Sequence, residues 1–232
     1  MKERSRLIVA LDVDTFDEAR RIIDELGDIV DIFKVGSHLF VAHGPSVIRG
    51  LQAKGKKIFL DLKFHDIPNT VAGAVRSAVS LRLFMLTVHA QGGLEMLQAA
   101  SKAAKEQAVA LDVPRPLIIG VTVLTSQARD ADTNDIVMQR ALLAKQAGLD
   151  GVVASVEEAA LVRGRLGQGF IIVTPGIRPA GTDAGDQKRA ATPAAAMKSG
   201  SDFLVVGRPI VQDKDPRAAA LRILKELSSH PP

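Results

Sequence analysis

The segment DLKFHDIPNT, residues 61–70, places three charged side chains directly after an apolar run. Charges at the end of a buried strand are costly unless they pair or bind something. In the run KIFLDLKF the side chains alternate, so Asp61 and Lys63 share one face and the apolar residues share the other. Asp66 follows where the chain turns, just before a proline that suits the start of a helix. Asp66 is therefore either a helix N-cap or a functional carboxylate.

Two more charged residues stand at the ends of other predicted strands, Asp12 after RLIVAL and Lys34 in DIFKVG. If these strands are neighbours, a ring of alternating charge forms at one mouth of the fold, with the members Asp12, Lys34, Asp61, Lys63 and Asp66. Each neighbour stabilises the charged form, so the lysines stay protonated and the carboxylates stay ionised. This arrangement favours Lys63 as a proton donor and argues against a Schiff-base lysine.

A second cluster lies near the last two predicted strands. VTPGIRP contains Arg178, VVGRPI contains Gly207 and Arg208, and the stretch between them supplies Gln187. Glycine permits close approach of the backbone, and a guanidinium group offers two parallel donors to a phosphate. These residues predict a phosphate site, whereas either arginine alone would be an ordinary solvated side chain.

Three polar residues at strand ends have no assignment from spacing alone. His89 in TVHAQGG has no neighbours at metal-ligand spacing, which favours a hydrogen-bonded structural histidine. Thr125 and Ser126 close a predicted strand and either contact a ligand or begin a loop. Because no His, Asp and Glu pattern suits a metal, we expect neither metal nor cofactor.

The elements that must position these residues alternate along the chain. Strand-like runs occur in RLIVALDV, DIFKVG, KIFLDLKF, FMLTVHA, PLIIGVTVL, GVVASV, FIIVTPG and DFLVVG, with amphipathic segments such as TFDEARRIIDELG between them. Alternation of strands and helices predicts parallel pairing. Eight such units in 232 residues predict one (β/α)8 barrel domain over residues 1–232. The alternative, an open doubly wound sheet, would show G-x-G-x-x-G after the first strand, and ALDVDTF lacks it.

The stretch PAGTDAGDQKRAATP, residues 179–193, has the composition of a mobile surface loop. In a barrel it lies on the face where active sites form, so we expect a lid that grips phosphate there, although an inert insertion has the same composition.

The composition narrows the class of function. Aromatic residues make up 3% of the chain, with no Trp or Tyr, which argues against stacking platforms for nucleic acid. The net charge of +4 is spread without a Lys/Arg tract, and there is no Cys. No apolar run approaches the length of a membrane span. The first apolar run soon reaches Asp12 and Asp14 without a small-residue cleavage site, so we expect a cytoplasmic protein with no nucleic-acid or membrane partner.

Eight motifs together resemble the orotidine 5'-phosphate decarboxylase family: ALDVD, FKVG, DLKFHDIPNT, TVHAQGG, VTVLTS, TPGIRP, DQKR and VVGRPI. The resemblance runs from the first predicted strand to the eighth. The D-x-K-x-x-D element is shared with related sugar-phosphate decarboxylases, and TPGIRP with the Gln-bearing loop adds specificity. One stretch departs from the pattern, because SLRLFMLTVHA has Arg82 and Phe84 where a Gly-x-Asp turn is common.

The resemblance implies a homodimeric barrel that converts orotidine 5'-phosphate to UMP and carbon dioxide, the last step of de novo pyrimidine synthesis. It implies that Lys63 protonates C6 of the pyrimidine while Asp61 lies against the substrate carboxylate. Asp66 and Thr70 would reach the site across the dimer interface. The implied remaining contacts are ribose at Asp12 and Lys34, the pyrimidine amide at Ser126, the ligand at Thr125, and phosphate at Arg178, Gln187, Gly207 and Arg208.

Decarboxylation normally uses a cofactor or metal as an electron sink. Without one, a carbanion at C6 must be stabilised by electrostatics, with Lys63 as the nearby cation. Two alternatives remain: a metal-dependent sugar-phosphate decarboxylase or aldolase on the same barrel, and a catalytically inactive sensor of phosphate ligands.

Overall fold

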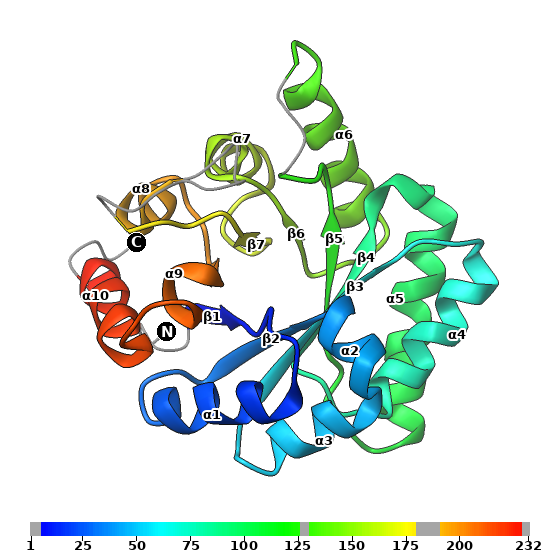
Figure 1. The fold of residues 1–232 in the computed structure, drawn as a ribbon. Coiled ribbons are helices and arrows are strands. Elements are labelled where there is room, and N and C mark those ends of the chain that lie inside the picture. Colours follow the sequence, from blue (N-terminus) through cyan, green and yellow to red (C-terminus); the bar gives the residue numbers. More distant parts are fainter. Residues whose placement is uncertain (1–5, 126–129, 180–190, 229–232) are drawn as a thin grey trace.

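Eight parallel strands form a closed barrel in which each strand pairs with the next and β1 pairs with β8 (Figure 1). The computed structural model describes residues 6–125, 130–179 and 191–228. The strands are β1 (Leu7–Ala10), β2 (Ile32–Gly36), β3 (Lys57–Phe64), β4 (Met85–His89), β5 (Leu117–Val121), β6 (Gly151–Val153), β7 (Ile171–Thr174) and β8 (Phe203–Val206). The predicted (β/α)8 barrel is confirmed.

Helices cover the outside of the barrel (Figure 1). They are α1 (Phe16–Leu26), α2 (Ser37–His43), α3 (Pro45–Gln52), α4 (Pro68–Val79), α5 (Gly93–Ala110), α6 (Thr133–Gln146), α7 (Val156–Leu166), α8 (Pro193–Lys198), α9 (Arg208–Val211) and α10 (Pro216–Ser228), with a short 3-10 turn η2 (Ala90–Gly92). Helix α1 illustrates why the sequence forms helices at these positions. The Thr15 hydroxyl caps α1 by accepting from the N–H of Glu18, and Ala19, Ile22 and Leu26 share its buried face.

The strands separate two apolar cores. Ile58 and Leu60 point outward into the large core beneath the helices, whereas Phe59 points inward with Met85 and Ile119. This is the alternation predicted for β3. Asp61 and Lys63 continue the inner face beyond Phe59, and both open into the pocket at the carboxyl ends of the strands.

The unusual stretch before β4 packs against the floor of the barrel. Arg82 has a φ of 52°, in the left-handed region, and its carbonyl accepts from the side-chain amide of Gln52. The ring of Phe84 meets Phe203 edge-on at 6.0 Å, and the Lys57 ammonium lies 5.2 Å from the centre of the Phe84 ring. A cation–π contact and an aromatic pair therefore hold the segment.

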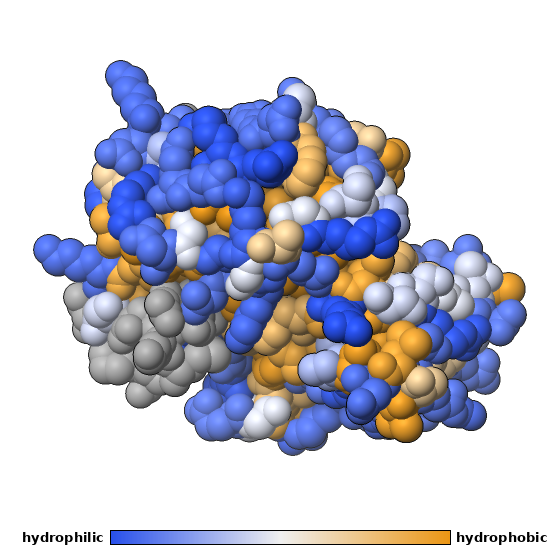
Figure 2. Space-filling view, turned by 90° about the horizontal axis from the view of Figure 1, so that it is seen from below, coloured by the Kyte–Doolittle hydropathy of each residue, from blue (hydrophilic) through white to orange (hydrophobic). Residues whose placement is uncertain are grey.

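The face shown in Figure 2 carries many hydrophilic side chains, with apolar side chains gathered in its middle and at its lower right. Among the large apolar residues that the structure describes, the most exposed are Val109, Val41 and Ile67. Within the described ranges, none of the helices has both the length and the apolar character needed to span a bilayer.

Candidate active site

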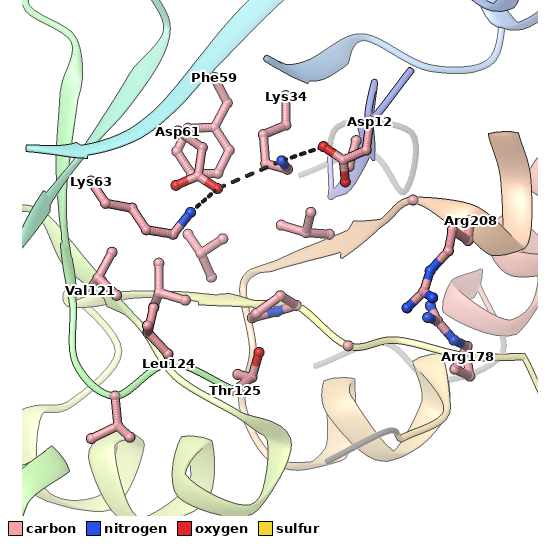
Figure 3. A pocket seen from close by; sticks show the side chains of 18 of the residues that line it. Asp12, Lys34, Phe59, Asp61, Lys63, Val121, Leu124, Thr125, Arg178 and Arg208 are labelled. Carbon is pink, nitrogen blue, oxygen red and sulfur yellow. Dashed lines mark hydrogen bonds and ion pairs between the residues drawn. The ribbon is translucent and has the colours of Figure 1, made fainter. Parts of the chain in front are cut away.

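A pocket of about 440 Å³ opens at the carboxyl ends of the strands, the end where barrel enzymes carry their active sites. Its volume lies in the range of small-molecule sites. The side chains and glycines that line it include Asp12, Lys34, Asp61, Lys63, Val121, Val123, Leu124, Thr125, Arg178, Gly207, Arg208 and Gln212. The lining thus combines a charged wall, an apolar wall and two arginines (Figure 3).

Four of the five residues of the predicted ring form a continuous chain of opposite charges (Figure 3). Lys34 Nζ lies 3.1 Å from Oδ1 of Asp12 and 3.7 Å from Oδ2 of Asp61. Lys63 Nζ lies 2.9 Å from the same Oδ2 of Asp61. Lys34 and Asp61 are largely buried, whereas the Lys63 side chain is 38% exposed toward the pocket. The ammonium of Lys63 can therefore meet a ligand while keeping its carboxylate partner.

Asp61 stays ionised in this setting. Burial by itself would raise the pKa of Asp61, but the charges of Lys34 and Lys63, together with hydrogen bonds from Lys63 and Thr87, hold that pKa below its usual value. The buried negative charge is thus a fixed part of the site at neutral pH.

Asp66, the fifth residue of that ring, does not join the other four within this chain. Asp66 is exposed, lies outside the pocket lining, and accepts from the backbone N–H of Ile67 at 2.6 Å. It is not the N-cap of α4 either, because Ile67 holds that position without a side-chain cap bond. Thr70, one turn into α4, is also exposed and outside the lining. The chain turns away from its own pocket directly after Lys63 and Phe64.

The predicted phosphate residues that the structure describes lie together on the far side of the pocket. Arg178 follows β7 and Arg208 begins α9, and both line the pocket, with their side chains pointing toward each other in the view of Figure 3. A Cβ atom at Gly207 would lie 3.4 Å from Oδ2 of Asp12, in van der Waals contact with the end of the charged chain. Thr125 also lines the pocket, whereas Ser126 and Gln187 lie outside the described residues.

His89 ends β4 and stacks on His65 with ring centres 5.1 Å apart. Its Nδ1 accepts from the backbone N–H of Gln91, which fits a structural histidine. Burial, then the neighbouring His65, Arg140 and Lys63, lower the pKa of His89 below its usual value. His89 is therefore neutral at physiological pH.

Two polar residues near the site were missed from sequence. Gln212 lines the pocket, and Thr87 hydrogen-bonds both Asp61 and Lys63 from β4. The available signal for Thr87 was a polar residue inside an apolar strand, which a packed core accepts when its hydroxyl is hydrogen-bonded.

Across residues 6–125, 130–179 and 191–228, no cluster of three or more His, Asp or Glu is arranged to hold a metal ion. The expectation of a metal-free site stays a prediction.

Comparison with known proteins agrees with the fold and the motifs. A curated relative named orotidine 5'-phosphate decarboxylase from Moorella thermoacetica is 49% identical, over 98% of this chain and 94% of its own. A relative of the same name from Vibrio atlanticus is 47% identical over 94% of this chain and 96% of its own. The crystal structure of orotidine 5'-phosphate decarboxylase from Lactobacillus acidophilus has a TM-score of 0.83 and 38% identity, covering 96% of this chain and 98% of that one.

The family model described as "Orotidine 5'-phosphate decarboxylase / HUMPS family" matches residues 5–223, which is nearly the whole chain. The charged chain, the two arginines and the barrel all lie within this range. The chain belongs to the orotidine 5'-phosphate decarboxylase / HUMPS family.

Proposed function

We propose that this protein decarboxylates orotidine 5'-phosphate to UMP and carbon dioxide in pyrimidine biosynthesis, with Lys63 as the proton donor. The observation that carries the proposal is the 2.9 Å contact between the Lys63 ammonium and the buried Asp61 carboxylate at the pocket wall. The description of the family also names HUMPS, but the relatives at 44–49% identity over nearly the whole chain are named as orotidine 5'-phosphate decarboxylases.

The layout of the pocket suits a nucleotide whose base carries a carboxylate. Arg178 and Arg208 provide donors for the phosphate at one side, and the charged chain lies at the other (Figure 3). Val121, Val123 and Leu124 form an apolar surface beside them on which the pyrimidine can lie. We assign ribose contacts to Asp12 and Lys34, a base contact to Ser126, and a ligand contact to Thr125, with Gln187 as a further phosphate ligand from the loop at 179–193.

The chemistry uses electrostatics in place of an electron sink. When the carboxylate leaves C6, the electron pair of the broken C–C bond stays on C6 as a carbanion. The Lys63 cation stabilises this charge and donates a proton to C6, which completes UMP. Asp61 lies against the substrate carboxylate and disfavours the bound ground state, and binding energy from the distant phosphate offsets that cost.

We further propose a cytoplasmic homodimer that works without metal or cofactor. Asp66 and Thr70 would enter the pocket of the partner subunit, and their outward position in this chain suits that role. Ile67, between them in sequence, exposes 67% of its surface, an apolar group that a dimer interface would cover.

The test follows the ultraviolet absorbance of orotidine 5'-phosphate, which falls as the carboxylate is lost. The wild type should turn over the substrate equally well with and without EDTA. Lys63→Ala should abolish turnover and still bind UMP, because Lys63 acts mainly in the transition state. Loss of activity with EDTA, restored by magnesium, would favour a sugar-phosphate enzyme, and UMP binding without turnover by the wild type would favour a sensor. If turnover by Lys63→Ala falls by less than about tenfold, the proposed role of Lys63 is contradicted.

A further inference from the structure

Thr87 in β4 hydrogen-bonds both Asp61 and Lys63, the two residues assigned to the reaction, although Thr87 itself lies outside the pocket lining. Its side chain is completely buried and belongs to the inward-facing residues of the strand, like Met85 two positions earlier. Its hydroxyl donates to Oδ1 of Asp61 at 2.9 Å and accepts from the backbone N–H of Lys63 at 2.9 Å. One hydroxyl group thus contacts the side chain of Asp61 and the main chain of Lys63.

The chemistry of the three groups fixes the direction of these bonds. A hydroxyl group has one proton to donate, an ionised carboxylate only accepts, and a backbone N–H only donates. The Thr87 proton must therefore point to Asp61, and its oxygen must receive the N–H of Lys63. Removing the hydroxyl would take one hydrogen bond from the Asp61 carboxylate and one from the Lys63 N–H. Both groups are in a buried place, where water does not easily replace the lost bonds.

The main chain at Lys63 has an unusual shape that this contact supports. β3 and β4 pair at Leu60↔Leu86 and again at Phe64↔Val88, so three residues of β3 lie opposite Thr87 alone. Within this irregularity Lys63 has a φ of 51°, in the left-handed region that residues with a side chain rarely adopt. Such a conformation persists only where the surroundings hold it.

The carboxylate of Asp61 is held at both oxygens. Thr87 binds Oδ1, while Lys63 and Lys34 approach Oδ2. Rotation of the carboxylate would lose one set of contacts or the other. The Thr87 hydroxyl therefore determines which oxygen faces the two lysines.

We propose that Thr87 is a positioning residue of the active site, whose hydroxyl orients the Asp61 carboxylate and keeps the Lys63 backbone in its left-handed conformation so that the ammonium is presented to the reacting carbon. This inference rests on the proposed function. It assigns to β4, which supplies no described residue of the pocket lining, a part in aligning the reacting groups.

The test compares Thr87→Val, which keeps the branched shape and removes the hydroxyl, with Thr87→Ser, which keeps the hydroxyl. For Thr87→Val we expect kcat to fall by about 10- to 100-fold, as expected for misaligned reacting groups. KM and the Kd for UMP should stay within about threefold of wild type, because an interaction that acts in the transition state leaves ground-state binding unchanged. Thr87→Ser should recover kcat to within about threefold of wild type.

A matched control is Thr174→Val. Thr174 is also a completely buried threonine on a barrel strand, but its hydroxyl bonds Ser201 at 2.7 Å and does not touch the charged chain. Its variant measures the general cost of losing a buried hydroxyl, and its kcat should match wild type. Urea unfolding of every variant separates stability from turnover, and Thr87→Ala replaces Thr87→Val if the valine variant does not fold.

The inference is overturned if the hydroxyl-free variants keep kcat within about threefold of wild type, or if Thr87→Ser is as slow as Thr87→Val. It is also overturned if KM rises as much as kcat falls, or if Thr87→Val and Thr87→Ala both fail to fold while Thr87→Ser folds, since the hydroxyl would then serve the fold. An inactive wild type contradicts the proposed function itself, whereas an active wild type with an equally active Thr87→Val contradicts the inference alone.

Discussion

The ammonium nitrogen of Lys63 lies 2.9 Å from Oδ2 of Asp61, inside a pocket that leaves the Asp61 side chain 12% exposed. Lys34 approaches the same oxygen at 3.7 Å. Two neighbouring cations favour the charged form of a carboxylate and so lower its pKa. The ion pair therefore links the stability of the fold to pH.

We expect this link to appear in acid. The pKa of Asp61 is lowered in the folded state from the ordinary value of 3.8, which the unfolded chain keeps. As the pH falls through that value, the unfolded state takes up the proton first, so the stability that Asp61 contributes at neutral pH is lost below it. Asp61→Asn has no carboxyl group to titrate. The difference in unfolding free energy, wild type minus Asp61→Asn, should therefore decrease as the pH falls through 3.8 and below.

Urea unfolding at several pH values measures this difference. Asp14→Asn is the control, because it also removes a carboxylate and the Asp14 side chain is 87% exposed. A wild-type curve that runs parallel to the Asp61→Asn curve over the whole range would show that Asp61 is not held ionised by its two lysines.

Arg208→Ala tests the phosphate site. Because the proposed phosphate contact lies far from the bond that breaks, its binding energy should appear in kcat/KM for the nucleotide, with a loss on the order of 2–5 kcal/mol. The phosphate-free nucleoside never uses the contact, so wild type and variant should process it equally. The control is Arg222→Ala, which removes an exposed cation paired with Asp213 and should leave kcat/KM unchanged for both substrates. Equal losses on nucleotide and nucleoside would place Arg208 at the pyrimidine or in the fold.

Mixed dimers test whether Asp66 serves the partner subunit. In a dimer of one Lys63→Ala chain and one Asp66→Asn chain, one site carries both changes and the other carries neither. Random reassembly makes about half of the dimers mixed, so about a quarter of wild-type activity should return for a twofold-symmetric dimer. Mass measurement of subunit exchange is the control. If exchange occurs and activity does not return, Asp66 acts in its own chain or not at all.

Arg82→Gly tests the irregular turn before β4. Arg82 is exposed and its φ of 52° is left-handed, which costs about 1–2 kcal/mol for a residue with a side chain. Glycine avoids that cost but gains about 0.5–1 kcal/mol of freedom in the unfolded chain. We expect a net stabilisation of up to about 1 kcal/mol in urea unfolding. Arg82→Ala keeps the backbone cost and should match wild type, so a glycine variant less stable than the alanine variant would contradict the account.

Much of the barrel could be predicted because its signals are local. Apolar runs alternate with amphipathic segments, and the alternation within KIFLDLKF correctly placed Asp61 and Lys63 on the inner face. Strand order then brings together residues that end neighbouring strands, which is why Lys34 and Asp61 meet, and why Arg178 and Arg208 line one side of the pocket.

The remaining features depend on relations between distant segments. The register shift between β3 and β4 has no local sequence signal, so neither the left-handed Lys63 nor the bond from Thr87 was predictable from DLKF or LTVH alone. Asp66 is near Lys63 in sequence, yet it is exposed in this chain, because the turn into α4 leads away from the pocket. Sequence position shows which strand, turn or helix a residue belongs to. It does not show on which side of a turn the side chain lies.

Closure of the barrel by β1 and β8 has a consequence for biosynthesis on the ribosome. Leu7 pairs with Leu204, so the first strand must wait for nearly the whole chain before it gains its second neighbour. Asp12 and Gly207 line the pocket on the two sides of that seam, one from the beginning of the chain and one from near its end. Contacts of such high sequence separation form late because the loop-closure entropy must be overcome first. A nascent chain that lacks β8 therefore contains Lys63 but not Gly207 and Arg208, and the lining of the pocket is complete only after the final strand has been synthesised.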